Sequence, residues 1–215
     1  MANHPATIAI MHYGERFNGY THLAGALFAL AGAVVLVVLG AMRADPWRIV
    51  SFSIYGTTLF LLYLSSTLYH RSRGRARNVL RKFDHGAIYL LIAGSYTPFT
   101  LVSLNGPWGW SLFGVVWGLA AIGIAQEFWL GKGARPLSLV IYLAMGWVAV
   151  IAVGPLIEAL TWPGFAWVAA GGLIYTVGIL FYAFDEKFRH WHGIWHLFVV
   201  AGSATHYAAI VLYVA

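Results

Sequence analysis

The chain has 215 residues, of which 60% are hydrophobic and only 9% are charged. Its mean hydropathy of +0.74 excludes an ordinary soluble globular domain, because such domains carry far more charged residues. The net charge of +6 does not predict nucleic-acid binding, since the basic residues lie between hydrophobic segments and form no separate basic domain. We therefore expect an all-α integral membrane protein.

Long uncharged stretches follow one another along the chain, and each is long enough for the roughly 20 residues that a membrane-crossing helix needs. The 42 uncharged residues from His85 to Gln126 contain the turn signal Asn105-Gly106-Pro107, which divides them into two helices. A second breaker lies at residues 161–164. The sequence predicts one domain, residues 1–215, with seven transmembrane helices at about 17–42, 49–70, 85–104, 107–129, 137–157, 164–184 and 191–214.

The distribution of lysine and arginine predicts how these helices are oriented, because cytoplasmic loops are enriched in both residues. If the N-terminus is cytoplasmic, only Arg43 and Arg48 lie outside. We therefore expect a cytoplasmic N-terminus and an external C-terminus. The basic residues that this orientation places inside are Arg16, Arg71, Arg73, Arg75, Arg77, Arg81, Lys82, Lys132, Arg135, Lys187 and Arg189.

Two missing features limit the chemistry and the processing of the chain. It has no cysteine, which excludes disulfides and thiolate ligands, so a metal must be held by His, Asp, Glu or Ser. Residues 1–16 lack the charged region, short apolar core and small-residue cleavage site of a signal peptide. We expect the first hydrophobic segment to be retained.

Ionisable side chains gather at one predicted depth, at the cytoplasmic ends of the helices. His192 and His196 are four residues apart, so both imidazoles project from one face of the last helix. The polar residues at the same level are Ser66 and His70 in the second helix, Asp84 and His85 at the start of the third, and Glu15, Asn18 and His22 in the first. Four helices therefore deliver polar groups to one layer.

Each of these residues also has a simpler interpretation when it is taken alone. A single histidine at a helix end is more often an interfacial or hydrogen-bonded residue than a ligand. Asp84 could be a helix N-cap, Glu15 a solvated charge, and Ser66 a donor to a carbonyl of its own helix. Their shared depth favours a common site, because unrelated residues need not lie at one level.

Three neutral imidazoles and a water molecule form a common catalytic zinc site. We predict His70, His192 and His196 as ligands of Zn²⁺, with Asp84 as the general base and Ser66 orienting Asp84, the water or a substrate carbonyl. Glu15, Asn18 and His22 are predicted to accept hydrogen bonds from the imidazoles or to line the entrance. His85 is a reserve ligand. His206 lies about 21 Å from His192 along a helix and cannot bind the same ion.

Several motifs resemble those of a known family. They are Glu15-x-x-Asn18-x-x-x-His22, Ser66-x-x-x-His70, FDHGAIYLLIAGSYTPF at residues 83–99 and HGIWHLFVVAGSATHY at residues 192–207. Together they are similar to the bacterial hemolysin III branch of the progestin and adipoQ receptor (PAQR) family. The resemblance implies a seven-helix protein of the bacterial cytoplasmic membrane, a role in membrane homeostasis, and zinc held by His70, His192 and His196 beside Asp84.

Three functions follow as hypotheses. The first is a ceramidase-like zinc hydrolase that acts on a lipid amide or ester. The second is a non-enzymatic sensor or homeostasis protein in which zinc is structural, and the third is a hemolysin-type pore or transporter. Under each hypothesis the expected partners are membrane lipids. In the first, they include a lipid or fatty-acyl substrate.

Overall fold

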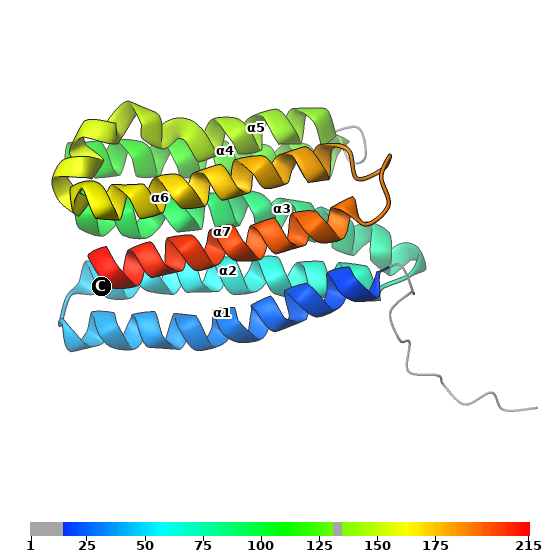
Figure 1. Ribbon diagram of the computed structural model, residues 1–215, viewed down its shortest axis with the longest axis horizontal. Helices are drawn as coiled ribbons and strands as arrows, with labels where there is room; N and C mark the ends of the chain where they lie inside the picture. The colour runs from blue at the N-terminus through cyan, green and yellow to red at the C-terminus, as the bar shows by residue number, and fades with distance from the viewer. Residues whose placement is uncertain (1–14, 131–134) are drawn as a thin grey trace, which may run out of the picture.

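The computed structural model describes residues 15–130 and 135–215, and this part of the chain is helical with no β-strand. The long helices pack side by side, with their axes roughly parallel, into one elongated bundle (Figure 1). Residues 1–14, which include most of the segment searched for a signal peptide, lie outside the described residues, as does Lys132. The fold is therefore the all-α bundle that the composition predicts.

Local sequence explains where several helices begin and end. Asp45 caps α2 by accepting a hydrogen bond from the Trp47 backbone N–H at 2.9 Å, and Pro46 suits the first helical position because it needs no N–H partner. Gly106, with φ +130°, forms the turn before Pro107. The elements are α1 Arg16–Met42, α2 Pro46–Arg71, α3 Gly74–Pro98, a π-helical turn Phe99–Ser103, α4 Pro107–Leu130, α5 Arg135–Trp147, a 3₁₀ turn Val148–Ala152, α6 Val153–Ala183 and α7 Trp191–Tyr213.

Within residues 15–130 and 135–215, six helical segments are long and apolar enough to cross a membrane. Five of them have between 23 and 30 residues, which suits a single crossing. The other, Arg135–Ala183, has 49 residues and would be more than twice the thickness of the hydrocarbon core if it were straight. It is interrupted at Thr161, which has φ 61° and ψ 169°, and α5 and α6 lie alongside each other (Figure 1).

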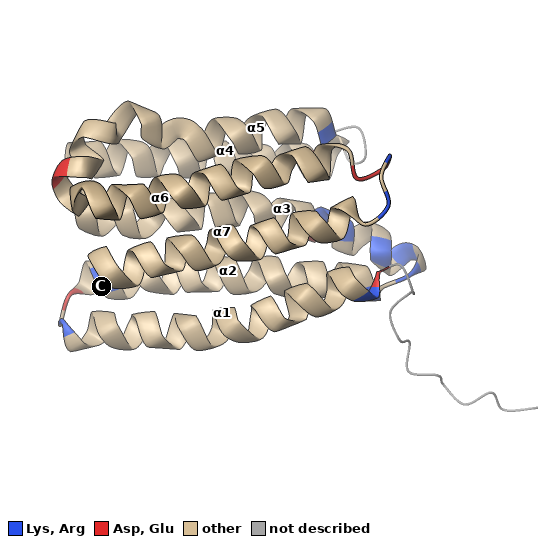
Figure 2. Cartoon of the chain, in the orientation of Figure 1, with Lys and Arg blue, Asp and Glu red and all other residues tan. Residues whose placement is uncertain are grey.

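Helix α3 begins well before the predicted third span. The prediction starts that span at residue 85, whereas the helix starts at Gly74. The basic run between them is therefore helical, which agrees with the good helix propensity of Arg, Ala, Leu and Lys. As a result, part of α3 projects from the same end of the bundle at which α1 and α7 begin (Figures 1 and 2).

Close approach of α7 to α1 depends on Gly193. A Cβ atom there would lie 2.6 Å from Cδ1 of Phe17 and 2.9 Å from Oδ1 of Asn18, so a larger residue would force these side chains or the helices to move. This contact brings the first turns of α7 against the start of α1.

Basic residues are concentrated at the end of the bundle where α1, α3, α5 and α7 begin (Figure 2). Arg43 follows the last residue of α1 and Arg48 lies in the first turn of α2, at the opposite end of the bundle, where the C-terminus also lies (Figure 1). The described chain thus enters the bundle at its basic end and leaves at the other.

Candidate metal centre

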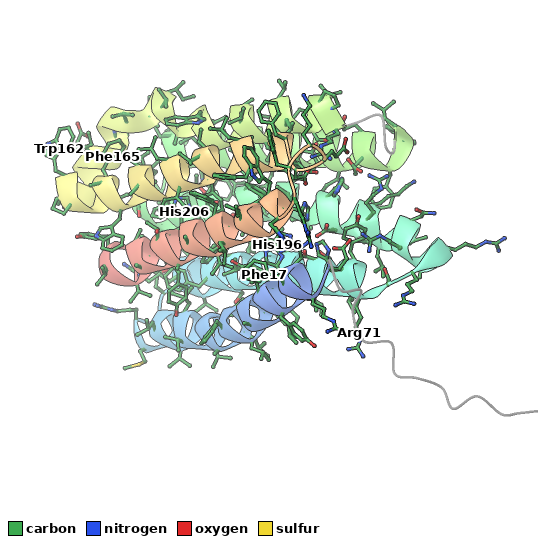
Figure 3. All side chains as sticks on the ribbon, turned by 45° about the vertical axis from the view of Figure 1, so that its right-hand side comes forward. Phe17, Arg71, Trp162, Phe165, His196 and His206 are labelled. Carbon is green, nitrogen blue, oxygen red and sulfur yellow. The ribbon has the colours of Figure 1, made fainter. Side chains whose placement is uncertain are left out.

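Three histidines converge near the basic end of the bundle. His70 lies one residue before the end of α2, and His192 and His196 occupy the first two turns of α7. Each can offer one ligand atom, and these atoms lie within 4.8 Å of one another. His196 lies near Phe17 at this end, far from Trp162 and Phe165 at the other (Figure 3). This group, the metal centre, could hold one metal ion.

The Nδ1 atoms of all three histidines already have hydrogen-bond acceptors. His70 Nδ1 lies 2.5 Å from a Glu15 carboxylate oxygen, and His192 Nδ1 lies 2.6 Å from a carboxylate oxygen of Asp185. His196 Nδ1 lies 3.1 Å from the backbone carbonyl oxygen of Asn18. An imidazole that donates from Nδ1 presents Nε2 as a lone pair, which is how metal-binding histidines are usually oriented.

Among the described residues, the Nε2 atoms have no hydrogen-bond partner outside this group. The Nε2 atoms of His192 and His196 lie 3.1 Å apart, and His70 Nε2 is buried without a hydrogen-bond partner among the described residues. Leaving a buried acceptor unpaired costs free energy, and one cation between the three nitrogens would satisfy all of them. The donor set therefore fits a metal ion.

Glu15 lies just before α1 and joins several elements of the site. Arg77 of α3 donates to one of its carboxylate oxygens at 2.6 Å, and the Asn18 side-chain amide donates to the other at 3.3 Å. Burial opposes ionisation of Glu15, but its hydrogen bonds and charge interactions with His70 and Arg77 prevail and lower its pKa to about 2. Glu15 is an ion-paired acceptor, so the solvated interpretation of this residue is wrong.

Asp185, in the loop between α6 and α7, has the same role for His192. It forms an ion pair with Arg135 at the start of α5. Burial raises the pKa of Asp185, but its hydrogen bonds to His192 and Arg135 outweigh that effect and lower it. The tight loop that brings it back to α7 ends at His190, which adopts a left-handed φ of 69°.

His22 lies in the same cluster but has a different contact. Its ring stacks on that of His196, with the centroids 3.6 Å apart and the planes 10° from parallel. Both ring nitrogens are buried without partners among the described residues. His22 thus supports one face of a ligand imidazole and supplies no hydrogen bond to it.

Ser66 and Asp84 border a cavity beside the metal centre. Ser66 Oγ is buried and makes no hydrogen bond among the described residues, so the interpretation that it bonds within its own helix is wrong. Asp84 is buried, with 8% of its surface exposed. It lies ten residues inside α3 and cannot be an N-cap. Its carboxylate forms no ion pair with the described part of the chain.

The cavity begins at the histidines and runs along the inside of the bundle. His206, ten residues after His196 on α7, lines its far part, so the cavity extends about 15 Å along this helix. A neighbouring cavity shares His206, Tyr96 and Trp147 as lining residues. Most of the intervening wall is apolar, and includes Leu62, Ile88, Leu91, Ile92, Ile179 and Val199.

Comparison with known proteins agrees with these features. Residues 12–207 match the model of a family described as haemolysin-III related. The chain belongs to this family. It is 40% identical to Hemolysin-3 of Bacillus cereus over 93% of this chain and 91% of that protein, and 42% identical to the Hemolysin-3 homolog of Bacillus subtilis over 93% of each. It is 32% identical to the human monocyte to macrophage differentiation factor over 92% of this chain and 83% of that protein. The membership and the helices identify a multi-pass membrane protein.

His85, the reserve ligand, lies outside the three-histidine group of this haemolysin III-related protein. Its Nδ1 is 3.2 Å from a carboxylate oxygen of Glu127, which also accepts a hydrogen bond from Arg81 at 3.0 Å. Ser138 lies 3.4 Å from the other Glu127 oxygen. These four residues, the Glu127 cluster, join α3, α4 and α5.

Sequence analysis missed Asp185 and Glu127 as site residues. Glu127 directly follows the uncharged stretch from His85 to Gln126, and Asp185 lies in the loop between α6 and α7; only 1% of Glu127 is exposed. A signal existed for Asp185, because a short loop from Asp185 to His192 can return a carboxylate to a histidine. No local pattern connects Glu127 with Arg81, which is 46 residues away.

Proposed function

We propose that this protein binds Zn²⁺ through His70, His192 and His196 and hydrolyses an amide or ester bond of a membrane lipid. The observation that supports it best is that Ser66 and Asp84 line the same apolar cavity as His192 and His196. Among the described residues the buried Ser66 hydroxyl has no hydrogen-bond partner and Asp84 has no ion pair. A self-sufficient structural site has no need of such groups.

The choice of Zn²⁺ rests on the donors. Three neutral imidazoles without a thiolate suit zinc, and three protein ligands leave a fourth position for water or substrate. Bound Zn²⁺ supplies a coordinated water of lowered pKa and a Lewis acid for a carbonyl oxygen.

The protein side chains supply the remaining functions. Asp84, a carboxylate without an ion pair in the described part of the chain, takes the proton from the attacking water and returns it to the leaving group. Ser66 donates a hydrogen bond to the substrate carbonyl oxygen as negative charge develops on it. The apolar wall beyond them holds the acyl chain and excludes bulk water.

The same proposal includes seven crossings, a cytoplasmic N-terminus and an external C-terminus in the bacterial cytoplasmic membrane. The interruption at Thr161 supports two crossings by the segment Arg135–Ala183. An odd number of crossings is also supported by the opposite positions of α1's first residue and the C-terminus, and the basic end suits the cytoplasm. A reporter enzyme fused after Ala215 should be active outside the cell; activity in the cytoplasm would contradict this orientation.

A non-enzymatic homeostasis protein with structural zinc is the second candidate. It is favoured by the groups that accept hydrogen bonds from the three histidines, which are Glu15, Asn18 and Asp185. Through these contacts a bound ion would hold together the start of α1, the end of α2 and the start of α7. Under this alternative Asp84 has no chemical task. The pore hypothesis stays a prediction from the sequence.

The deciding experiment compares wild-type protein with Asp84→Ala in vesicles of the host's lipids. We expect wild type to release fatty acid and Asp84→Ala to lose at least two orders of magnitude in rate while it retains zinc. Glu158→Gln, which removes an exposed carboxylate elsewhere, is the matched control. Equal turnover by both variants, or no turnover by wild type with zinc bound, would favour the structural role.

A further inference from the structure

Helix α3 is longer than a membrane crossing requires. Together with the π-helical turn it covers Gly74–Ser103, 30 residues, or about 45 Å of helix. The hydrocarbon core is about 30 Å thick, so roughly ten residues remain for the headgroup region. Figure 2 shows that the end of α3 that projects from the bundle is the basic end. We call residues 71–83 the basic segment.

Three arginines of the basic segment have no ion-pair partner among the described residues. Arg71, Arg73 and Arg75 are exposed and form no ion pair among the described residues. No acidic residue lies between Asp45 and Asp84. The Arg71 side chain points away from the bundle (Figure 3). Three arginines without an ion pair in the described part of the chain therefore lie at the end of the bundle that the proposed orientation places at the cytoplasmic headgroups.

Exposed apolar side chains accompany these charges. Val79 is 55% exposed and Phe83 is 51% exposed, and the two lie one turn apart on the same face of the helix. A helix that combines arginines with exposed apolar residues is typical of the membrane interface, where apolar groups contact acyl chains and basic groups contact headgroups. A soluble anion would have no use for Val79 and Phe83.

We propose that Arg71, Arg73 and Arg75 bind the phosphate of an anionic phospholipid headgroup, and that Arg77 couples this site to the metal centre. The proposal is independent of hydrolysis, because it concerns a lipid that regulates the centre and is not consumed there. Clusters of basic residues next to a transmembrane helix recognise anionic lipids in this way.

The coupling follows a short chain of contacts. Arg73 is the residue just before α3, and its backbone carbonyl oxygen accepts a hydrogen bond from the Arg77 N–H at 3.4 Å, so the two residues lie one turn apart at the start of the helix. Arg77 donates to Glu15 at 2.6 Å, and the second oxygen of Glu15 lies 2.5 Å from His70 Nδ1. A phosphate held at Arg73 competes with Glu15 for the Arg77 guanidinium. Glu15 then becomes a stronger acceptor for His70, which makes His70 a better metal ligand.

Lipid binding is tested by native mass spectrometry of the purified full chain with equal amounts of phosphatidylglycerol and phosphatidylcholine. Each arginine near anionic lipid contributes about a fivefold factor, so at low salt R71Q/R73Q/R75Q should lose roughly two orders of magnitude of phosphatidylglycerol preference. R43Q/K187Q/R189Q removes the same charge elsewhere and should retain it. Equal preference in wild type and R71Q/R73Q/R75Q would overturn the lipid site.

Coupling is tested by titrating zinc into metal-free protein in nanodiscs of phosphatidylcholine, with and without phosphatidylglycerol. We expect wild type to bind zinc severalfold more tightly when phosphatidylglycerol is present. In R77Q the two affinities should be equal, whatever their absolute value. Equal affinities in wild type, or an undiminished lipid effect in R77Q, would overturn the coupling.

Discussion

The metal centre and the Glu127 cluster are both groups of buried ionisable residues, yet their hydrogen bonding is opposite. In the Glu127 cluster the carboxylate lies in the middle and is contacted by side-chain polar atoms of Arg81, His85 and Ser138. In the metal centre the carboxylates lie at the rim. In its middle His70 Nε2 has no hydrogen-bond partner among the described residues, and the Nε2 atoms of His192 and His196 contact only each other. A charge that the protein itself satisfies indicates a structural role, whereas three imidazole nitrogens that converge within 4.8 Å fit one metal ion.

The largest expected difference between the metal centre and the Glu127 cluster is in metal content after a histidine is removed. His196→Ala deletes one of three ligand atoms, and we expect the protein to lose its bound metal altogether, a loss of more than about 4 kcal/mol of binding free energy. The control is His85→Ala in the Glu127 cluster. Metal content of the purified proteins measures the effect; if His85→Ala lost metal and His196→Ala kept it, the two assignments would be reversed.

Glu127→Gln should affect folding and leave the metal in place. The substitution leaves the Arg81 guanidinium, whose side chain is 14% exposed, without its counter-charge. Breaking a buried pair costs about 3–5 kcal/mol, which we expect as a lower unfolding temperature of the metal-free protein. A variant with unchanged thermal stability would show that Glu127 has no such structural role.

Asp185→Asn should weaken metal binding without abolishing it. The amide accepts a weaker hydrogen bond from His192, and changing such a partner typically lowers metal affinity about 10–100-fold. Competition with a zinc chelator measures this loss. Glu186→Gln removes the neighbouring exposed carboxylate and serves as the control, since Glu186 contacts Arg135 and not His192. The idea fails if the two variants bind zinc equally.

The smallest expected effect is the loss at low pH of the stability that the Glu15 carboxylate contributes to the metal-free protein. The folded-state pKa of Glu15 is lowered from 4.5 to about 2. Its stabilising effect is therefore fully present above pH 4.5 and is lost as the pH falls toward 2. Thermal unfolding of wild type should decline in this window by more than that of Glu15→Gln. Parallel curves would show that Glu15 is not selectively stabilised as the carboxylate.

Local sequence predicted several of the residues that form the metal centre. The spacing of His192 and His196 places both on one face of a helix, and that relation holds for any helix of this sequence. The predicted depth of His70 also agrees with the structure, since the three imidazoles converge. The roles proposed for Ser66 and Asp84 stay predictions, although their positions on the cavity are compatible with them.

By itself, the sequence determined the class of protein, the order of its apolar segments and the pairing of the two histidines on α7. These depend on composition and on periodicity within single helices. Tertiary structure alone decided that Asp185 bonds His192, that Glu15 joins Arg77 to His70, and that His85 turns toward Glu127. Such pairings depend on how separate helices rotate and pack against each other, and the periodicity of one helix carries no information about its neighbour.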